Sequence, residues 1–292
     1  MKNAHKVITA QIIEQMETAG SNWLNPMVGG AEFGMPRNAV TGRRYAGINV
    51  LILGFTGQYW ATYNQWQSKG CQVRKGEKAT HIVLFKPLEV KDKQTGDQKV
   101  IPFMKSFCVF SANQVDGEFA EKITGAKQDA VDETEIIAAA DEWVTASGAE
   151  INHSRGASAY YRPSTDSIHM PNREVFADTG TSNATQTYYS TLLHELGHWT
   201  GHKDRLARIK LTNSFGNEGY AFEELIAELA SAFQCALLNI SVTPREDHAK
   251  YLNNWIRVLK DNPRAIFKAA AAAEKAVQFI EDLQPQSQEA AA

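Results

Sequence analysis

Residues 192–199 read Leu-Leu-His-Glu-Leu-Gly-His-Trp, and this stretch determines what the C-terminal half of the chain can be. In a helix, residues four positions apart lie on one face, so His194 and His198 can direct their imidazoles at one point. Neutral imidazole is a natural ligand for zinc. The preceding Leu192 and Leu193 favour a buried helix. The stretch therefore predicts a metal site on a helix within the protein core.

Glu195 is the candidate catalytic residue of this site. It follows the first histidine directly and is turned by about 100° around the helix. There it can take a proton from an attacking water and pass it to a leaving amine. This division of roles is typical of the HExxH zinc metallopeptidases. One divalent metal ion is expected, most simply Zn²⁺, although the same ligands accept Mn²⁺.

A catalytic zinc needs a third protein ligand, and a downstream helix offers candidates. Glu224 and Glu228 lie in the segment Phe-Glu-Glu-Leu-Ile-Ala-Glu, four residues apart and therefore on one face. One can bind the metal while the other accepts a hydrogen bond from the far nitrogen of a ligating histidine. We favour Glu224 as the ligand and Glu228 as the outer partner, with Glu223 as a weaker candidate.

Asp204 is the rival third ligand. Together with the HExxH motif and Gly201 it gives the spacing of the metzincins, with an aspartate in place of their third histidine. Metzincins also carry a methionine turn downstream, but this chain has no methionine after Met170. Gly201 is then better explained as the C-terminal cap of the helix. Asp204 remains open as an alternative to Glu224 and Glu228.

Length and charge point to two parts with different roles. A chain of 292 residues suits two domains, which we place at residues 1–125 and 133–285. Residues 1–125 hold 15 Lys and Arg against 10 Asp and Glu, a sum of +5, whereas the remainder sums to −8. A basic half suggests nucleic acid as a partner. Three scattered cysteines favour a reducing, cytoplasmic compartment, and no segment predicts a signal peptide or a membrane span.

The fold class predicted by the pattern is α+β. The first half mixes an apolar run at 48–55 with an aromatic-rich helix at 58–69 and strands at 81–85 and 101–110, joined by a hairpin tip at 91–99. The second half is mainly helical, with short strands near 160–161 and 167–170. Its helices are expected at 133–148, 181–201, 220–239, 248–259 and 263–283. We predict a small α+β domain followed by a mainly helical, zincin-like domain.

Basic side chains beside aromatic ones make the first half a candidate binder of single-stranded DNA. Such strands are held by a basic groove together with aromatic platforms on which bases stack. One cluster surrounds a turn at Gly42, and a second follows some thirty residues later. The candidate contacts are Arg37, Arg43, Arg44, Tyr45, Asn49, Arg74, Lys75 and Lys78.

Several separate motifs resemble one known family. HELGHWTGHKDRL at 194–206 and YAFEELIAELASAF at 220–233 are similar to the ArdC-type antirestriction proteins of conjugative plasmids. The first half agrees through MPRN at 35–38, TGRRYAGIN at 41–49, QVRKGEK at 72–78 and VFSANQV at 109–115. These N-terminal motifs also resemble a domain of plasmid-encoded TraC-type primases. The likeness spans nearly the whole chain.

The resemblance implies an N-terminal domain that binds single-stranded DNA and a C-terminal SprT-like or Glu-zincin metallopeptidase domain. It also implies that the protein shields incoming plasmid DNA from host restriction, in the bacterial cytoplasm. The family's metal triad maps onto His194, His198 and Glu224, with Glu195 as the catalytic glutamate. Asp204 departs from the family, where a small polar residue is expected.

Two further interpretations stay open. The protein can be a DNA-associated zinc protease with a protein substrate, or a coat for single-stranded DNA whose metal site is not catalytic. A weaker possibility is an inhibitor that occupies a restriction enzyme through its acidic surface. The metal ligands favour a peptidase, whereas the charge asymmetry favours a DNA-binding protein.

Overall fold

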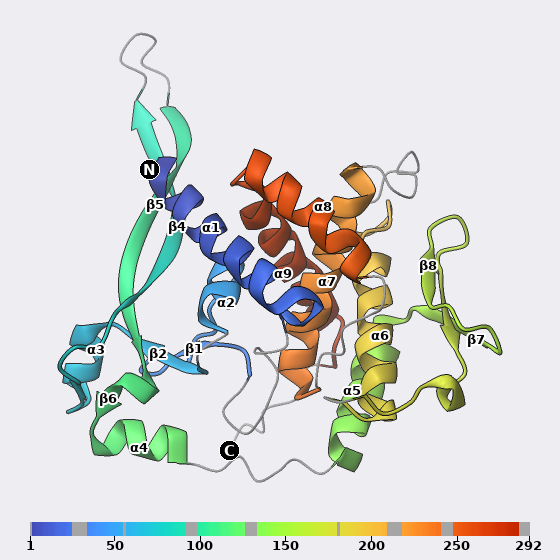
Figure 1. Ribbon diagram of the computed structural model, residues 1–292, viewed down its shortest axis with the longest axis horizontal. Helices are drawn as coiled ribbons and strands as arrows, with labels where there is room; N and C mark the ends of the chain where they lie inside the picture. Colours follow the sequence, from blue (N-terminus) through green and yellow to red (C-terminus); the bar gives the residue numbers. More distant parts are fainter. Residues whose placement is uncertain are drawn as a thin grey trace.

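The computed structural model describes residues 2–24, 34–54, 57–91, 98–125, 133–179, 182–208, 218–240 and 248–285 (Figure 1). Its helices are α1 (Lys2–Ala19), α2 (Ile48–Leu53), α3 (Tyr63–Ser68), α4 (Glu118–Gly125), α5 (Glu133–Ser147), α6 (Ala184–Trp199), α7 (Glu218–Leu238), α8 (His248–Asp261) and α9 (Ala265–Asp282). Its strands are β1 (Arg37–Asn38), β2 (Tyr59–Ala61), β3 (Gln72–Val73), β4 (Thr80–Lys91), β5 (Gln98–Ser111), β6 (Val115–Asp116), β7 (Glu150–Ser154), β8 (Tyr160–Arg162) and β9 (Ser167–Pro171). The predicted mixture of a small sheet-rich N-terminal region and a helical C-terminal region is confirmed.

A long hairpin dominates the first half. Strands β4 and β5 pair antiparallel and project beyond the rest of the molecule in Figure 1, while β2 and β1 continue the sheet from β5 in the order β1-β2-β5-β4. The hairpin is longer than its apolar pattern predicts, because pairing continues into more polar sequence. Residues 92–97 of the predicted tip lie outside the described residues.

The helix predicted at 58–69 is wrong in its first part, where β2 forms. Thr62 begins the real helix, because its hydroxyl accepts from the Gln65 amide while the Gln65 side chain accepts from the Thr62 amide. This reciprocal capping box satisfies amides that would otherwise lack partners at a helix start. The preceding residues are thereby free to pair with β1 and β5, which buries Trp60 in the sheet.

Close packing of α6 against α7 builds the core of the second half. Gly197 makes this approach possible, since a Cβ atom there would meet the Cα and carbonyl oxygen of Ala227 at 3.3 Å. Buried hydrogen bonds join the two helices, from Ser231 to the Ser190 carbonyl and from Gln234 to the Leu193 carbonyl, each 3.0 Å long. Such bonds satisfy buried polar groups and fix the register of one helix on the other.

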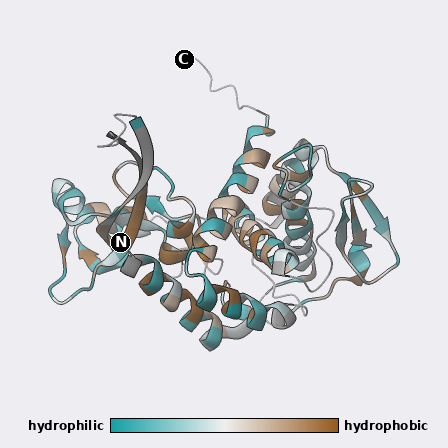
Figure 2. Ribbon diagram, turned by 90° about the horizontal axis from the view of Figure 1, so that it is seen from above, coloured by the Kyte–Doolittle hydropathy of each residue, from teal (hydrophilic) through white to brown (hydrophobic). Residues whose placement is uncertain are grey.

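A small sheet lies beside α6. Strand β9 is central, with β7 parallel on one side and β8 antiparallel on the other. The strands at 160–162 and 167–171 agree with the sequence pattern, whereas β7 is not predicted because its residues are mostly exposed and polar. Figure 2 shows this end of the molecule as largely hydrophilic, with hydrophobic segments gathered toward the middle.

The N-terminal helices share the main hydrophobic core with the C-terminal ones. Ile12 and Met16 of α1 and Leu51 of α2 belong to the same buried cluster as residues of α6, α7, α8 and α9. The Thr9 hydroxyl donates to the Pro263 carbonyl at 2.7 Å, and Lys260 pairs with Glu17 at 2.8 Å. No described helix is long and apolar enough to cross a membrane.

Candidate metal centre

Helix α6 carries the histidines into the core. Asn183 begins the helix through a capping box with Gln186, and the buried part of the helix starts at Tyr188. From there the packed face of the helix is buried, and His194, Glu195 and His198 are at most 9% exposed. Three polar side chains so deep in the core require partners.

Three buried side chains form a metal-ligand cluster. The ligand atoms of His194, His198 and Glu224 all lie within 4.8 Å of one another. The Nε2 atoms of the two histidines lie 3.5 and 3.4 Å from the two carboxylate oxygens of Glu224. A tetrahedral ion with ligands at about 2.0–2.2 Å would separate neighbouring ligand atoms by about 3.3–3.6 Å. The donor set and its spacing therefore fit one divalent metal ion.

A second carboxylate stands behind each histidine. Glu228 lies 3.3 Å from Nδ1 of His194, and Glu223 lies 3.6 Å from Nδ1 of His198. A carboxylate on the far nitrogen fixes the orientation and tautomer of a ligating imidazole. Glu228 thus has the position expected for an outer partner.

Arg208 holds Glu223 in place from beyond the end of α6. Its guanidinium donates to both oxygens of Glu223, at 3.4 and 3.0 Å, and to the Gly197 carbonyl at 2.8 Å. A further bond of 2.9 Å reaches the Thr200 hydroxyl. Because Arg208 joins α6 to α7 and neutralises Glu223, the outer carboxylate is itself fixed.

The charges of the cluster support one another. Burial alone would lower the pKa of His198, but Glu224 and Glu223 outweigh it and raise that pKa to about 10. Burial would raise the pKa of Glu224, yet His198 and His194 hold it far below its usual range. In the metal-free protein these carboxylates favour the protonated form of His198, so a metal ion competes with a proton for this ligand. The Tyr220 hydroxyl also donates to Glu224, one helical turn away.

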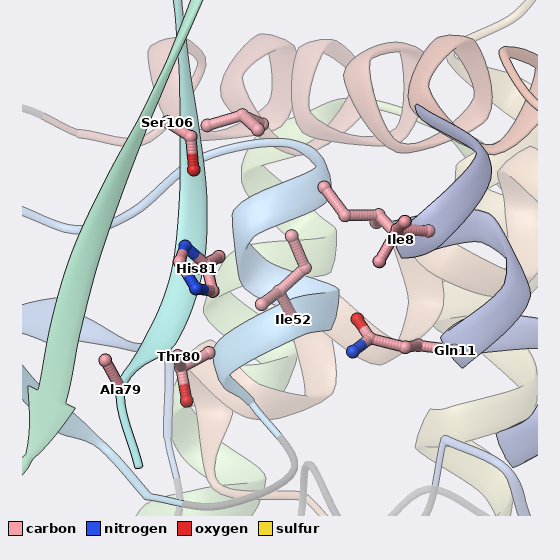
Figure 3. Close-up of a pocket in the computed structure, with 9 residues that line it drawn as sticks. Ile8, Gln11, Ile52, Ala79, Thr80, His81 and Ser106 are labelled. Carbon is pink, nitrogen blue, oxygen red and sulfur yellow. The ribbon is translucent and has the colours of Figure 1, made fainter. Parts of the chain in front are cut away.

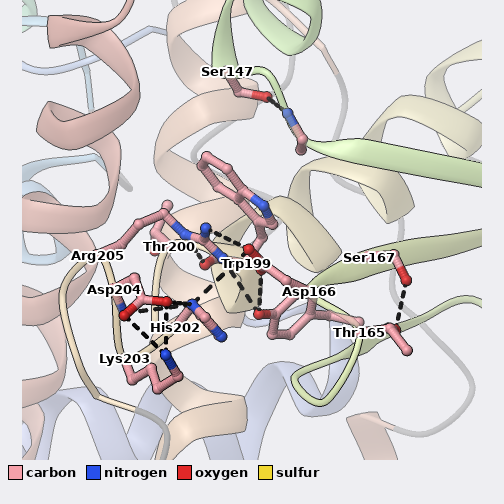
Figure 4. A network of polar contacts seen from close by, with 12 residues as sticks. Ser147, Thr165, Asp166, Ser167, Trp199, Thr200, His202, Lys203, Asp204 and Arg205 are labelled. Carbon is pink, nitrogen blue, oxygen red and sulfur yellow. Dashed lines mark hydrogen bonds and ion pairs between the residues drawn. The ribbon is translucent and has the colours of Figure 1, made fainter.

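Asp204 is not part of the metal-ligand cluster and lies on the protein surface. It pairs with Lys203 at 2.8 Å, and its side chain is 66% exposed. The neighbouring Arg205 instead binds Asp166 in the turn between β8 and β9, and its guanidinium stacks 3.8 Å from the centre of the Trp199 ring (Figure 4). This network fixes the end of α6 against the small sheet.

Four of the eight candidate DNA contacts are engaged within the protein. Arg44 pairs with Glu281 of α9 at 2.7 Å, and the Tyr45 hydroxyl accepts from Asn38 at 3.3 Å. The Asn49 side chain exchanges two hydrogen bonds with the backbone of Val83, at 2.7 and 2.9 Å. Arg74 is held by two carboxylates and two carbonyls; those partners are Glu77, Asp116, Asn113 and Val115.

The other four candidates are less constrained. Arg37, Arg43, Lys75 and Lys78 are exposed, and none of the four makes an ion pair with another described residue. Arg43 follows the tight turn at Gly42, whose φ is +70° and whose geometry Asn38 stabilises by accepting from the Val40 and Thr41 amides.

Comparisons with known proteins agree with this architecture. Residues 2–110 match the N-terminal domain of the anti-restriction factor ArdC, and residues 138–272 match a zincin-like metallopeptidase. Two DNA primases TraC of Escherichia coli are 39% and 40% identical over 96% of this chain. The chain spans only 20% and 27% of the length of those primases. An uncharacterized protein y4eC of Sinorhizobium fredii is 37% identical, and the alignment covers 96% of this chain and 92% of that protein.

Two crystal structures of the antirestriction protein ArdC from plasmid R388 share the whole fold. The metal-free form superposes with a TM-score of 0.77 at 37% identity, covering 96% of this chain and 97% of that one. The Mn(II)-bound form gives 0.75 at 35% identity, covering 97% and 99%. Sequence and fold agree over nearly the full length. The chain therefore belongs to the ArdC family of antirestriction proteins.

Proposed function

We propose that this protein binds single-stranded DNA in the cytoplasm of a plasmid-bearing bacterium, protects incoming DNA from restriction, and carries a zinc metallopeptidase in its C-terminal half. The observation that carries the peptidase assignment is the buried triad His194, His198 and Glu224, with Glu195 beside it on α6. Zinc is the metal that these donors favour. The Mn(II) bound by the related ArdC supports manganese as an alternative.

The chemistry follows from what the residues around the site do. A bound zinc ion would supply Lewis acidity, which acidifies water and polarises a carbonyl. Glu195 would take the proton of the attacking water and donate it to the leaving amine. Glu228 and Glu223 would each accept a hydrogen bond from Nδ1 of a histidine, which leaves Nε2 available to the metal and orients the ring toward it.

The proposed DNA binding is supported by the charge of the N-terminal half and by its similarity to other proteins. Residues 1–125 carry a sum of +5, and Arg37, Arg43, Lys75 and Lys78 keep their charges available among the described residues. The N-terminal match is to the ArdC domain, and two curated relatives are DNA primases. Neutralising phosphates with such side chains would give salt-dependent affinity.

The decisive experiment compares single- and double-stranded DNA at two salt concentrations, using wild-type protein and Glu195→Ala in parallel. We expect both proteins to prefer single strands and to lose affinity at the higher salt concentration, because Glu195 takes no part in DNA binding. The absence of binding by both would refute the DNA assignment and leave the metallopeptidase alone. Loss of binding only in Glu195→Ala would show that the two activities share one site.

A further inference from the structure

A cavity of about 360 Å³ opens between α1, α2 and the base of the β4–β5 hairpin. Figure 3 shows Ile8 and Gln11 of α1 facing His81 and Ser106 of the hairpin, with Ile52 of α2 between them. This volume falls within the range of small-molecule pockets, about 300–1,000 Å³. Its lining residues all lie between positions 7 and 106, and none of the proposed zinc ligands is among them.

The cavity combines an apolar floor with a polar rim. Ile8 and Val83, which are buried, and Ile52, which is half-buried, form the floor. The exposed His81 and Gln11 contribute hydrogen-bonding groups at the rim. A flat heteroaromatic ring with polar edges has the matching distribution of apolar faces and hydrogen-bonding atoms.

The hairpin wall of the cavity is rigidly placed. Asn49 binds both the amide and the carbonyl of Val83, which ties α2 to the free edge of β4. Unpaired edge groups are thereby satisfied without another strand. Asn49 belongs to the motif that first suggested DNA binding, and its contacts assign it to building this wall rather than to touching a base.

Aromatic rings extend the cavity along the same strand face. His81, Val83 and Phe85 alternate on β4 and therefore point to one side. Phe85 remains 48% exposed, with the rings of His5 and Phe267 at 6.4 and 6.2 Å. Exposed rings next to a pocket are the platforms on which bases of single strands stack.

The charge around the cavity also suits a nucleic acid. Lys6 and Lys78 directly precede lining residues in the sequence, and no Asp or Glu is adjacent in sequence to any lining residue. Neither of these lysines makes an ion pair with another residue that the structure describes. An apolar peptide side chain would leave such cations without partners, whereas a nucleotide brings a phosphate with each base.

We propose that this cavity receives one unstacked base of single-stranded DNA, with His81 as a stacking or hydrogen-bonding partner at its mouth. This inference rests on the proposed DNA-binding function and gives it a location. It also predicts that base identity matters little, because stacking accepts every base.

A blocking variant tests the proposal. Ser106→Trp places a large ring in the cavity from an exposed position, whereas Leu84→Trp adds the same ring on the opposite hairpin face as a matched control. Binding of labelled oligothymidylate should weaken about fivefold to a hundredfold in Ser106→Trp, with an unchanged salt slope, and should not change in Leu84→Trp. An abasic oligonucleotide of equal length should bind both variants and the wild type equally weakly.

A second measurement needs no variant. Cys108 is exposed and its Sγ lies 3.6 Å from Nδ1 of His81, whereas Cys71 and Cys235 are buried. Oligothymidylate should therefore slow alkylation of Cys108 in the wild type, and the abasic strand should not. If the wild type binds oligothymidylate but Cys108 stays equally reactive and Ser106→Trp binds normally, the cavity is not the base site and the proposed function stands. If the wild type binds no single strand, the proposed function fails as well.

Discussion

Replacing Glu228 by glutamine tests whether the outer carboxylates control metal binding. The amide keeps the shape of the side chain but removes the negative charge 3.3 Å from Nδ1 of His194. Both side chains are at most 4% exposed, so water does not screen the lost interaction. Losing such a partner costs about 10–100-fold in metal affinity, or about 1.4–2.7 kcal/mol, and the burial here favours the upper part of that range.

The assay is competition for zinc between the metal-free protein and a chromophoric chelator at neutral pH. Asp204→Asn is the control, because Asp204 lies at the surface and pairs with Lys203. We expect Glu228→Gln to bind zinc at least tenfold more weakly and Asp204→Asn to match the wild type. Equal affinities for all three proteins would refute the role of Glu228, and a loss in Asp204→Asn alone would restore the rival ligand set.

Four other perturbations have defined outcomes. Glu195→Gln should retain full zinc content by elemental analysis while abolishing any peptide cleavage, and retained cleavage would remove Glu195 from its assigned role. Gly197→Val should separate α6 from α7 and lower both zinc affinity and melting temperature, since even a Cβ atom there meets the α7 backbone at 3.3 Å. The raised pKa of His198 in the metal-free protein contributes stability that is complete below about pH 6.5 and is lost as the pH rises through about 10. The melting temperature of that form should fall over this interval, and zinc uptake at neutral pH should release a proton, seen as a buffer-dependent heat in calorimetry. Arg43→Ala combined with Lys75→Ala should reduce the salt slope of single-strand binding by about one for each lost phosphate contact, and an unchanged slope would move the DNA path elsewhere.

The metal cluster was predictable because its geometry is local. The spacing of His194 and His198, and of Glu224 and Glu228, fixes which side chains share a helix face. The contact between Glu223 and His198 depends instead on how α7 is rotated against α6, which Gly197 and the buried inter-helix bonds determine. Arg208 approaches from outside both helices, so no periodicity indicates it.

The first half was harder to predict for a different reason. Aromatic residues at helical spacing between 58 and 69 favoured a single helix, but the capping box at Thr62 places a boundary inside that pattern. Likewise Asn49 and Arg74 have the residue types of DNA contacts, while their partners at Val83 and Asp116 are distant in sequence. Residue type alone does not distinguish a polar side chain that faces solvent from one that links two distant segments of the chain.

The packing of α1 against the last helices affects how the chain folds during synthesis and whether its halves can fold separately. Ile12 and Met16 share their buried cluster with residues of α8 and α9 beyond residue 250, and α1 contacts α8, so native contacts of high sequence separation must close late. A fragment ending near residue 125 would expose that apolar face and is expected to aggregate. If the gene is fused into a longer one, both halves must therefore be carried over together. The alignments with the two longer primases agree, since they cover 96% of this chain.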